Sequence, residues 1–216
     1  MFRNSGGYGS ALACAAALTI GCVSDAPAPA EPHASSHVHA PLSVAETARL
    51  NQQIAELRRT TAAFHNPEKA REVGYTVNFG CIDERAAGLP AEVARGMGDH
   101  ITIADASGNF PLLGDDRVEL LHPEFLVYGR QPGSGELKLA GFDYFIPASA
   151  MWPSPANGGV PPTLLGMPMR WSPVFNGWMF HIWAWWHNPD GITVDFNPSV
   201  PLCGCQVSPT SPSCST

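Results

Sequence analysis

The stretch Trp178-Met-Phe-His-Ile-Trp-Ala-Trp-Trp186 is the strongest strand pattern in the sequence. Alternate residues of a strand face opposite sides of a sheet, and both sides of this stretch are rich in aromatic and aliphatic side chains. We therefore expect a strand that is covered on both sides. One of its inward residues is His181, which the pattern places inside the domain.

Upstream of this strand, residues 125–128 and 137–146 are predicted to pair through the hairpin loop 131–135. The apolar positions of the second strand change phase at Ala140-Gly141. A bulge at the glycine would bring the apolar residues before and after it onto one face.

Shorter strands are predicted at 75–77, 101–103 and 192–196, and the Pro- and Gly-rich stretch 147–177 is predicted to be a long irregular loop.

The N-terminal part of the domain is predicted to be helical. Apolar residues recur at helical spacing across 43–64, and Ser43 with Glu46 forms a capping-box pattern at the start. A second short helix follows Asn66-Pro67 and ends at Gly74. The expected fold class is α+β, with the N-terminal helix packed on a mostly antiparallel sheet that stays open or curls into a barrel or roll.

Residues 1–21 have the features of a secretory signal: one early arginine, a short apolar run and small residues at the end. The end of the run, Leu18-Thr-Ile-Gly-Cys22, resembles a bacterial lipobox, which implies lipidation at Cys22; ordinary cleavage near alanines 15–17 is the alternative. We expect residues 22–42 to be a Pro/Ala/His-rich tether. Residues 43–205 would form a single globular domain, and 206–216 a disulfide-tied tail.

The predicted location is therefore the bacterial cell envelope, with the chain exported and attached to a membrane through its lipid anchor. The chain carries 12 Lys and Arg against 19 Asp and Glu, a formal net charge of −7, which disfavours nucleic acid as a partner. An exported chain also meets an oxidising compartment.

Four cysteines remain in the mature domain and predict two disulfides. Cys81 would pair with Cys203, leaving Cys205 to Cys214, or Cys81 would pair with Cys205, leaving Cys203 to Cys214. A direct Cys203–Cys205 bond would be strained. A metal or redox site at Cys203 and Cys205 is a further alternative.

The candidate metal ligands are His100, Glu124 and His181. Two imidazoles and one carboxylate suit zinc, copper, iron or manganese. Two further residues, His122 and Asp143, are reserve ligands, and the tether histidines 33, 37 and 39 form a looser second possibility.

The sequence assigns no catalytic residue. It has no G-x-S-x-G motif and no phosphate-binding loop. Besides a metal-binding lipoprotein, it allows a module for carbohydrate or another small ligand, with Trp152 and Trp171 as contacts. A structural envelope protein is the third possibility.

Four motifs follow one another along the chain: G-M-G-x-H at 96–100, P-E-x-L-x-Y at 123–128, D-Y-F-x-P at 143–147 and H-x-W-x-W-x-x-N-P-x-G at 181–191. Over about residues 45–203 the chain resembles a family of exported bacterial proteins of unknown function. The resemblance implies export, a single domain and a disulfide between a cysteine after Gly74-Tyr75 and one after the Asn-Pro-x-Val stretch at 197–200. The chain departs from the family pattern at Gly177, where His is expected.

Overall fold

A computed structural model describes residues 43–216 except 106, 209–210 and 215–216. Side chains are described up to Gly204, except those of Ala87 and Ala106. The predicted signal, the lipidation site Cys22 and the tether lie outside the described residues, as do the side chains of Cys205 and Cys214.

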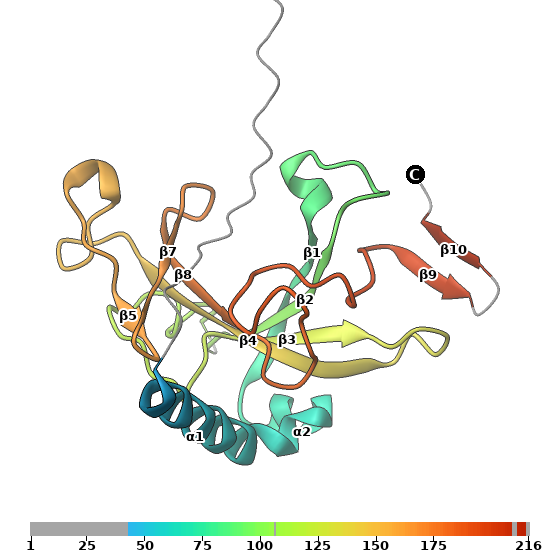
Figure 1. The fold of residues 1–216 in the computed structure, drawn as a ribbon, viewed down its shortest axis with the longest axis horizontal. Coiled ribbons are helices and arrows are strands. Elements are labelled where there is room, and N and C mark those ends of the chain that lie inside the picture. The colour runs from blue at the N-terminus through green and yellow to red at the C-terminus, as the bar shows by residue number, and fades with distance from the viewer. Residues whose placement is uncertain (1–42, 106, 209–210, 215–216) are drawn as a thin grey trace, which may run out of the picture. The chain divides into compact units, whose positions relative to one another are not determined.

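The domain is built on one six-stranded sheet in the order β1-β2-β3-β4-β8-β7, and every neighbouring pair is antiparallel. Figure 1 shows the helices on one side of this sheet. The predicted α+β class is confirmed. Among the described strands β1 and β7 are the two edges, so the sheet does not close into a barrel. The six strands are β1 (Tyr75–Asp83), β2 (Gly96–Ile103), β3 (Phe125–Arg130), β4 (Leu137–Pro147), β7 (Arg170–Ser172) and β8 (Gly177–Ile182).

Helix α1 (Val44–Thr61) begins with the predicted capping box between Ser43 and Glu46. It continues as a 3-10 turn, η1 (Ala62–His65), and α2 (Pro67–Glu72) follows. Leu57 is fully buried and Ile54 nearly so, because the apolar stripe of α1 packs against the sheet. In the part of the chain that the structure describes, no helix is long and apolar enough to cross a membrane.

The bulge predicted in the fourth strand is confirmed. In the β3–β4 ladder Tyr128 pairs with Leu139 and Val127 with Gly141, so Ala140 is the extra residue. The phase change therefore keeps the apolar residues on both sides of the bulge in the core that faces α1. The carbonyl of Ala140 accepts hydrogen bonds from the backbone N–H groups of Trp185 and Trp186.

The remaining elements are short. The stretch 147–177 contains β5 (Thr163–Leu164), β6 (Met167–Pro168) and η3 (Pro155–Asn157) as well as β7, so it is more ordered than the predicted irregular loop. η2 (Glu84–Ala87) follows β1, and β9 (Cys205–Ser208) pairs with β10 (Ser211–Cys214).

The strand predicted at 192–196 is wrong. The predicted strand from Trp178 stops at Ile182, after which Trp183 N–H bonds to Ile192 O while the chain turns away. Side chains bond to the backbone carbonyls of 192–196 in place of a neighbouring strand. The indole of Trp183 donates to Val194 O, and the side-chain amide of Asn188 donates to Phe196 O.

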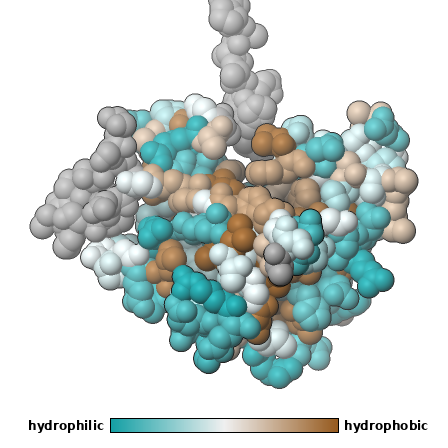
Figure 2. Space-filling model, turned by 180° about the vertical axis from the view of Figure 1, so that it is seen from behind, coloured by the Kyte–Doolittle hydropathy of each residue, from teal (hydrophilic) through white to brown (hydrophobic). Residues whose placement is uncertain are grey.

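The surface is mixed in character. Figure 2 shows hydrophilic areas with apolar side chains gathered in patches between them. Four strongly exposed apolar residues, Met151, Val160, Val174 and Phe175, come from the segment between β4 and β8.

Candidate metal centre

Three polar side chains converge on the sheet face opposite α1. Asp143 of β4 lies directly across from His181 of β8. His100 of β2 lies across from Val127 of β3, two residues beyond the Phe125 that pairs with Asp143. Cross-strand partners, and residues two apart along one strand, share a face. The register alone therefore brings His100, Asp143 and His181 to one place, with β3 between the first two.

The three side chains form a compact, buried group. Their relative exposures are 2% for His100, 1% for Asp143 and 0% for His181. His100 Nε2 lies 3.3 Å from Asp143 Oδ2, and His181 Nδ1 lies 3.5 Å from Asp143 Oδ1. One potential ligand atom from each residue lies within 4.8 Å of the other two.

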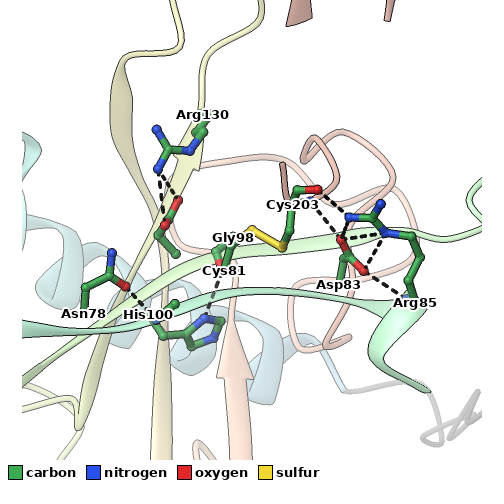
Figure 3. Close-up of a disulfide and its surroundings, with 10 residues drawn as sticks. Asn78, Cys81, Asp83, Arg85, Gly98, His100, Arg130 and Cys203 are labelled. Carbon is green, nitrogen blue, oxygen red and sulfur yellow. Dashed lines mark hydrogen bonds and ion pairs between the residues drawn. A yellow bond between two sulfur atoms is a disulfide. The ribbon is translucent and has the colours of Figure 1, made fainter. Parts of the chain in front are cut away.

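The hydrogen bonds leave His100 Nε2 directed at the carboxylate. His100 Nδ1 lies 3.0 Å from the carbonyl oxygen of Gly98, drawn as a dashed line in Figure 3. A carbonyl can only accept, so we assign the proton to Nδ1. In the neutral ring, Nε2 then presents a lone pair to Asp143 Oδ2, and two acceptors face each other. This Nδ1–H to carbonyl arrangement is the one that orients metal-binding histidines.

Four buried polar atoms of this group have no hydrogen-bond partner among the described residues: His100 Nε2, Asp143 Oδ2 and both ring nitrogens of His181. A buried polar atom without a partner costs free energy, and native structures rarely concentrate several in one place. The group therefore presents buried electron pairs that a bound cation or a proton could satisfy.

The protonation states of Asp143 and His181 favour a bound cation. Burial raises the pKa of Asp143, but the neighbouring His181 and His100 outweigh it and lower that pKa to about 2. Burial lowers the pKa of His181 despite the attraction of Asp143. At neutral pH the centre therefore holds an ionised carboxylate beside a neutral His181.

The spacing of the donor atoms fits one metal ion. Donors about 2.0–2.1 Å from a tetrahedral zinc ion are roughly 3.3 Å from each other. The separations of 3.3 and 3.5 Å are close to this value, although they end on different oxygens of Asp143, and one donor atom from each residue lies within 4.8 Å of the other two. Two imidazole nitrogens and a carboxylate oxygen are also a donor set that zinc, iron and manganese accept.

Two neighbours fix the ring of His181. A Cβ atom on Gly141 would lie 2.4 Å from Ile182 O and 3.2 Å from His181 Nε2, so only glycine leaves room here. On another side, the ring centroid of Trp183 lies 4.3 Å from that of His181. The bulge of β4 and the turn after β8 thus both hold this ligand in place.

Glu124, the carboxylate predicted as a ligand, does not belong to the group, and Asp143 takes its place. Glu124 directly precedes Phe125, whose side chain shares the face of Asp143, so the alternation along the chain directs Glu124 to the other side. Its Oε2 accepts a hydrogen bond of 3.3 Å from Phe145 N. The other reserve ligand, His122, is exposed beside Glu119.

Glu124 is instead a buried neutral acid. Burial, assisted by the charges of Asp115 and Asp143, raises its pKa to about 9. The folded chain therefore holds a proton here between about pH 4.5 and 9 that the unfolded chain releases. The free energy of unfolding must fall as pH rises through this window, by at most about 1.4 kcal/mol per pH unit.

We expect Glu124→Gln to remove this component. Between about pH 5 and 8, three pH units at this slope, the wild type should lose up to about 4 kcal/mol more unfolding free energy than the variant. Urea titrations at the two pH values measure the difference, and parallel profiles for the two proteins would show that Glu124 is ionised in the folded state.

A disulfide joins Cys81 of β1 to Cys203, which is the first of the two predicted pairings. Asp83 Oδ2 accepts a hydrogen bond of 2.8 Å from Cys203 N, and Arg85 bonds to both Asp83 and Cys203 O, as Figure 3 shows. Because Cys203 is oxidised, it is not a thiolate ligand. In β9–β10 the backbones of Cys205 and Cys214 are paired opposite each other.

The two tryptophans predicted as ligand contacts pack against the core. Trp152 is half-buried, and its indole donates to Asp116 O over 3.0 Å. Trp171 is half-buried and meets Trp178 edge-on, with ring centroids 5.3 Å apart. Their role in ligand binding stays a prediction.

No family model, curated protein or solved structure matches the chain. The resemblance to an exported bacterial family therefore stays a prediction.

Proposed function

We propose that this domain binds one divalent transition-metal ion through His100, Asp143 and His181. The observation that carries the proposal is a buried cluster of three ring nitrogens and one carboxylate oxygen, none of which has a hydrogen-bond partner among the described residues. A cation would accept electron pairs from His100 Nε2, from His181 and from Asp143 at once, and would balance the carboxylate charge.

Zinc is the ion that we propose, because two imidazoles and a carboxylate are a donor set that it accepts. It takes three protein ligands of this kind and leaves a fourth position for water. The ligands come from β2, β4 and β8, so the ion would connect three strands of the sheet. We infer a stabilising role, in which binding of the ion adds directly to the stability of the folded domain.

Metal content tests the proposal. After purification and dialysis with zinc, the full-length wild type should retain one zinc ion per chain. The His181→Gln variant should not retain this ion, because the substitution removes a buried ligand. His122→Gln is the matched control, since His122 is exposed and does not belong to the group. Elemental analysis gives the stoichiometry. Equal zinc content in all three proteins, or none in the wild type, would refute the site.

We further propose that the chain is an exported lipoprotein of the bacterial cell envelope, anchored through Cys22. Two features support this: the lipobox-like sequence before Cys22 and the Cys81–Cys203 disulfide, a bond typical of oxidising compartments. In a bacterial host, Cys22→Ser should move the protein out of the membrane fraction, because a signal without its acceptor cysteine receives no lipid. An unchanged distribution on immunoblots of fractionated cells would contradict the anchor.

A further inference from the structure

A second site lies beyond the metal centre. The loop that follows β8 borders a cleft of about 510 Å³, within the size range of small-molecule sites. Its walls include Trp183, Trp185, Trp186 and His187 from the loop and Arg58 from α1. Most of the H-x-W-x-W-x-x-N-P-x-G motif thus borders this cleft, and the metal uses only its first residue.

The loop is held rigidly from within. Asn188 is 5% exposed, and its side-chain amide donates to Phe196 O over 2.9 Å while its oxygen accepts from Asp190 N over 3.1 Å. Gly191 closes the turn with a φ of +133°, a conformation that favours glycine. The cleft is therefore preformed, which lowers the entropic cost of binding a ligand.

The aromatic walls are only partly covered. Trp185 meets the ring of His65 edge-on at 4.3 Å, and Trp186 lies against Gly129, where a Cβ atom would come within 2.7 Å of the indole. Both tryptophans nevertheless remain half-buried and border the cleft. Partly exposed indoles offer flat apolar faces to a ring-shaped ligand.

The charge of the cleft is positive in a chain of net negative charge. Arg58 donates its Nε–H to Ala184 O, which ties the guanidinium to the turn after β8. Its Nη groups make no hydrogen bond or ion pair with the described residues, and a guanidinium binds a carboxylate through two such donors. None of the described residues that line the cleft is acidic.

We propose that this cleft binds a small ring-shaped carboxylate, with the ring against the tryptophans and the carboxylate on Arg58. Two chemical sources share this description, a sugar acid and an aromatic acid. The proposal is independent of the metal centre.

Calorimetric titration of the full-length protein with glucuronate, benzoate and neutral glucose tests the proposal. We expect saturable binding of at least one carboxylate and at least tenfold weaker binding of glucose. Arg58→Gln should weaken carboxylate binding at least tenfold. Arg59→Gln is the matched control: Arg59 is the next residue, is exposed, pairs with Glu56 and does not line the cleft.

Two further titrations distinguish this cleft from the metal centre: one of the wild type in a chelator, and one of the Asp143→Asn variant. A carboxylate that binds to the metal should no longer bind in either titration, whereas a carboxylate that binds to Arg58 should bind in both. Circular dichroism confirms that each variant is folded. Binding of glucuronate alone identifies a sugar acid, and binding of benzoate alone an aromatic acid. No binding of either carboxylate, equal loss in both arginine variants, or binding that the chelator abolishes would overturn the proposal.

Discussion

A Cys81→Ser/Cys203→Ser variant is expected to lose about 4–5 kcal/mol of unfolding free energy. The disulfide joins residues 122 positions apart, and a crosslink that closes so long a loop removes much of the conformational entropy of the unfolded chain. Removal of the disulfide should also destabilise the segment that ends at Cys203. This segment pairs with β2 through Gly96 and Asn197, and Val200 packs with Trp183 beside the metal centre.

Denaturant titrations measure this loss. Cys205→Ser/Cys214→Ser is the control, because the loop between these positions is short and a bond there should contribute roughly half as much. A loss below about 1 kcal/mol in the Cys81→Ser/Cys203→Ser variant would show that the disulfide does not hold the domain together.

An Asp143→Asn variant is expected to lose its stabilisation by metal. With zinc at a hundredfold excess over the dissociation constant, the wild type should gain about 2.7 kcal/mol, a rise of roughly 5–10 °C in the melting temperature. Asparagine has almost the same shape but no charge, so the ion loses its only anionic ligand. In a chelator the variant should melt no lower than the wild type, because it buries no charge.

Thermal melts with and without zinc separate these two effects. Glu119→Gln, which removes an exposed acid, is the control and should keep the full metal-dependent shift. A variant at Asp143 that zinc stabilises as much as the wild type would exclude this carboxylate as a ligand. A variant that melts lower than the wild type in the chelator would indicate instead a protonated His100 paired with Asp143.

Two of the three residues in the candidate metal centre were predictable from the sequence. His181 lies within a strand that is apolar on both sides, and His100 follows a glycine pair at the start of another strand. The predicted carboxylate, Glu124, lies outside this group, because the sequence shows only that it precedes an apolar strand and not which face it takes. The alternation of side chains along the strand would have identified Asp143 instead. Asp143 lies between Phe142 and Tyr144, which face α1, so its side chain faces the opposite side of the sheet.

The same limit explains the strand that did not form. The stretch 192–196 has the composition of a strand, yet its carbonyls are satisfied by the side chains of Trp183 and Asn188. Such side-chain-to-backbone hydrogen bonds follow from tertiary structure, which local pattern does not contain. The bulge at Ala140 was predictable because it leaves its mark in the pattern itself, as a change of apolar phase.

The most direct measurement is anomalous X-ray diffraction from crystals of the full-length protein grown with zinc, recorded on both sides of the zinc absorption edge. We predict one peak on the sheet face opposite α1, about 2.0–2.1 Å from His100 Nε2, from a ring nitrogen of His181 and from a carboxylate oxygen of Asp143. The absence of a peak there, or a peak only at the histidines of the tether, would contradict a metal centre in this domain.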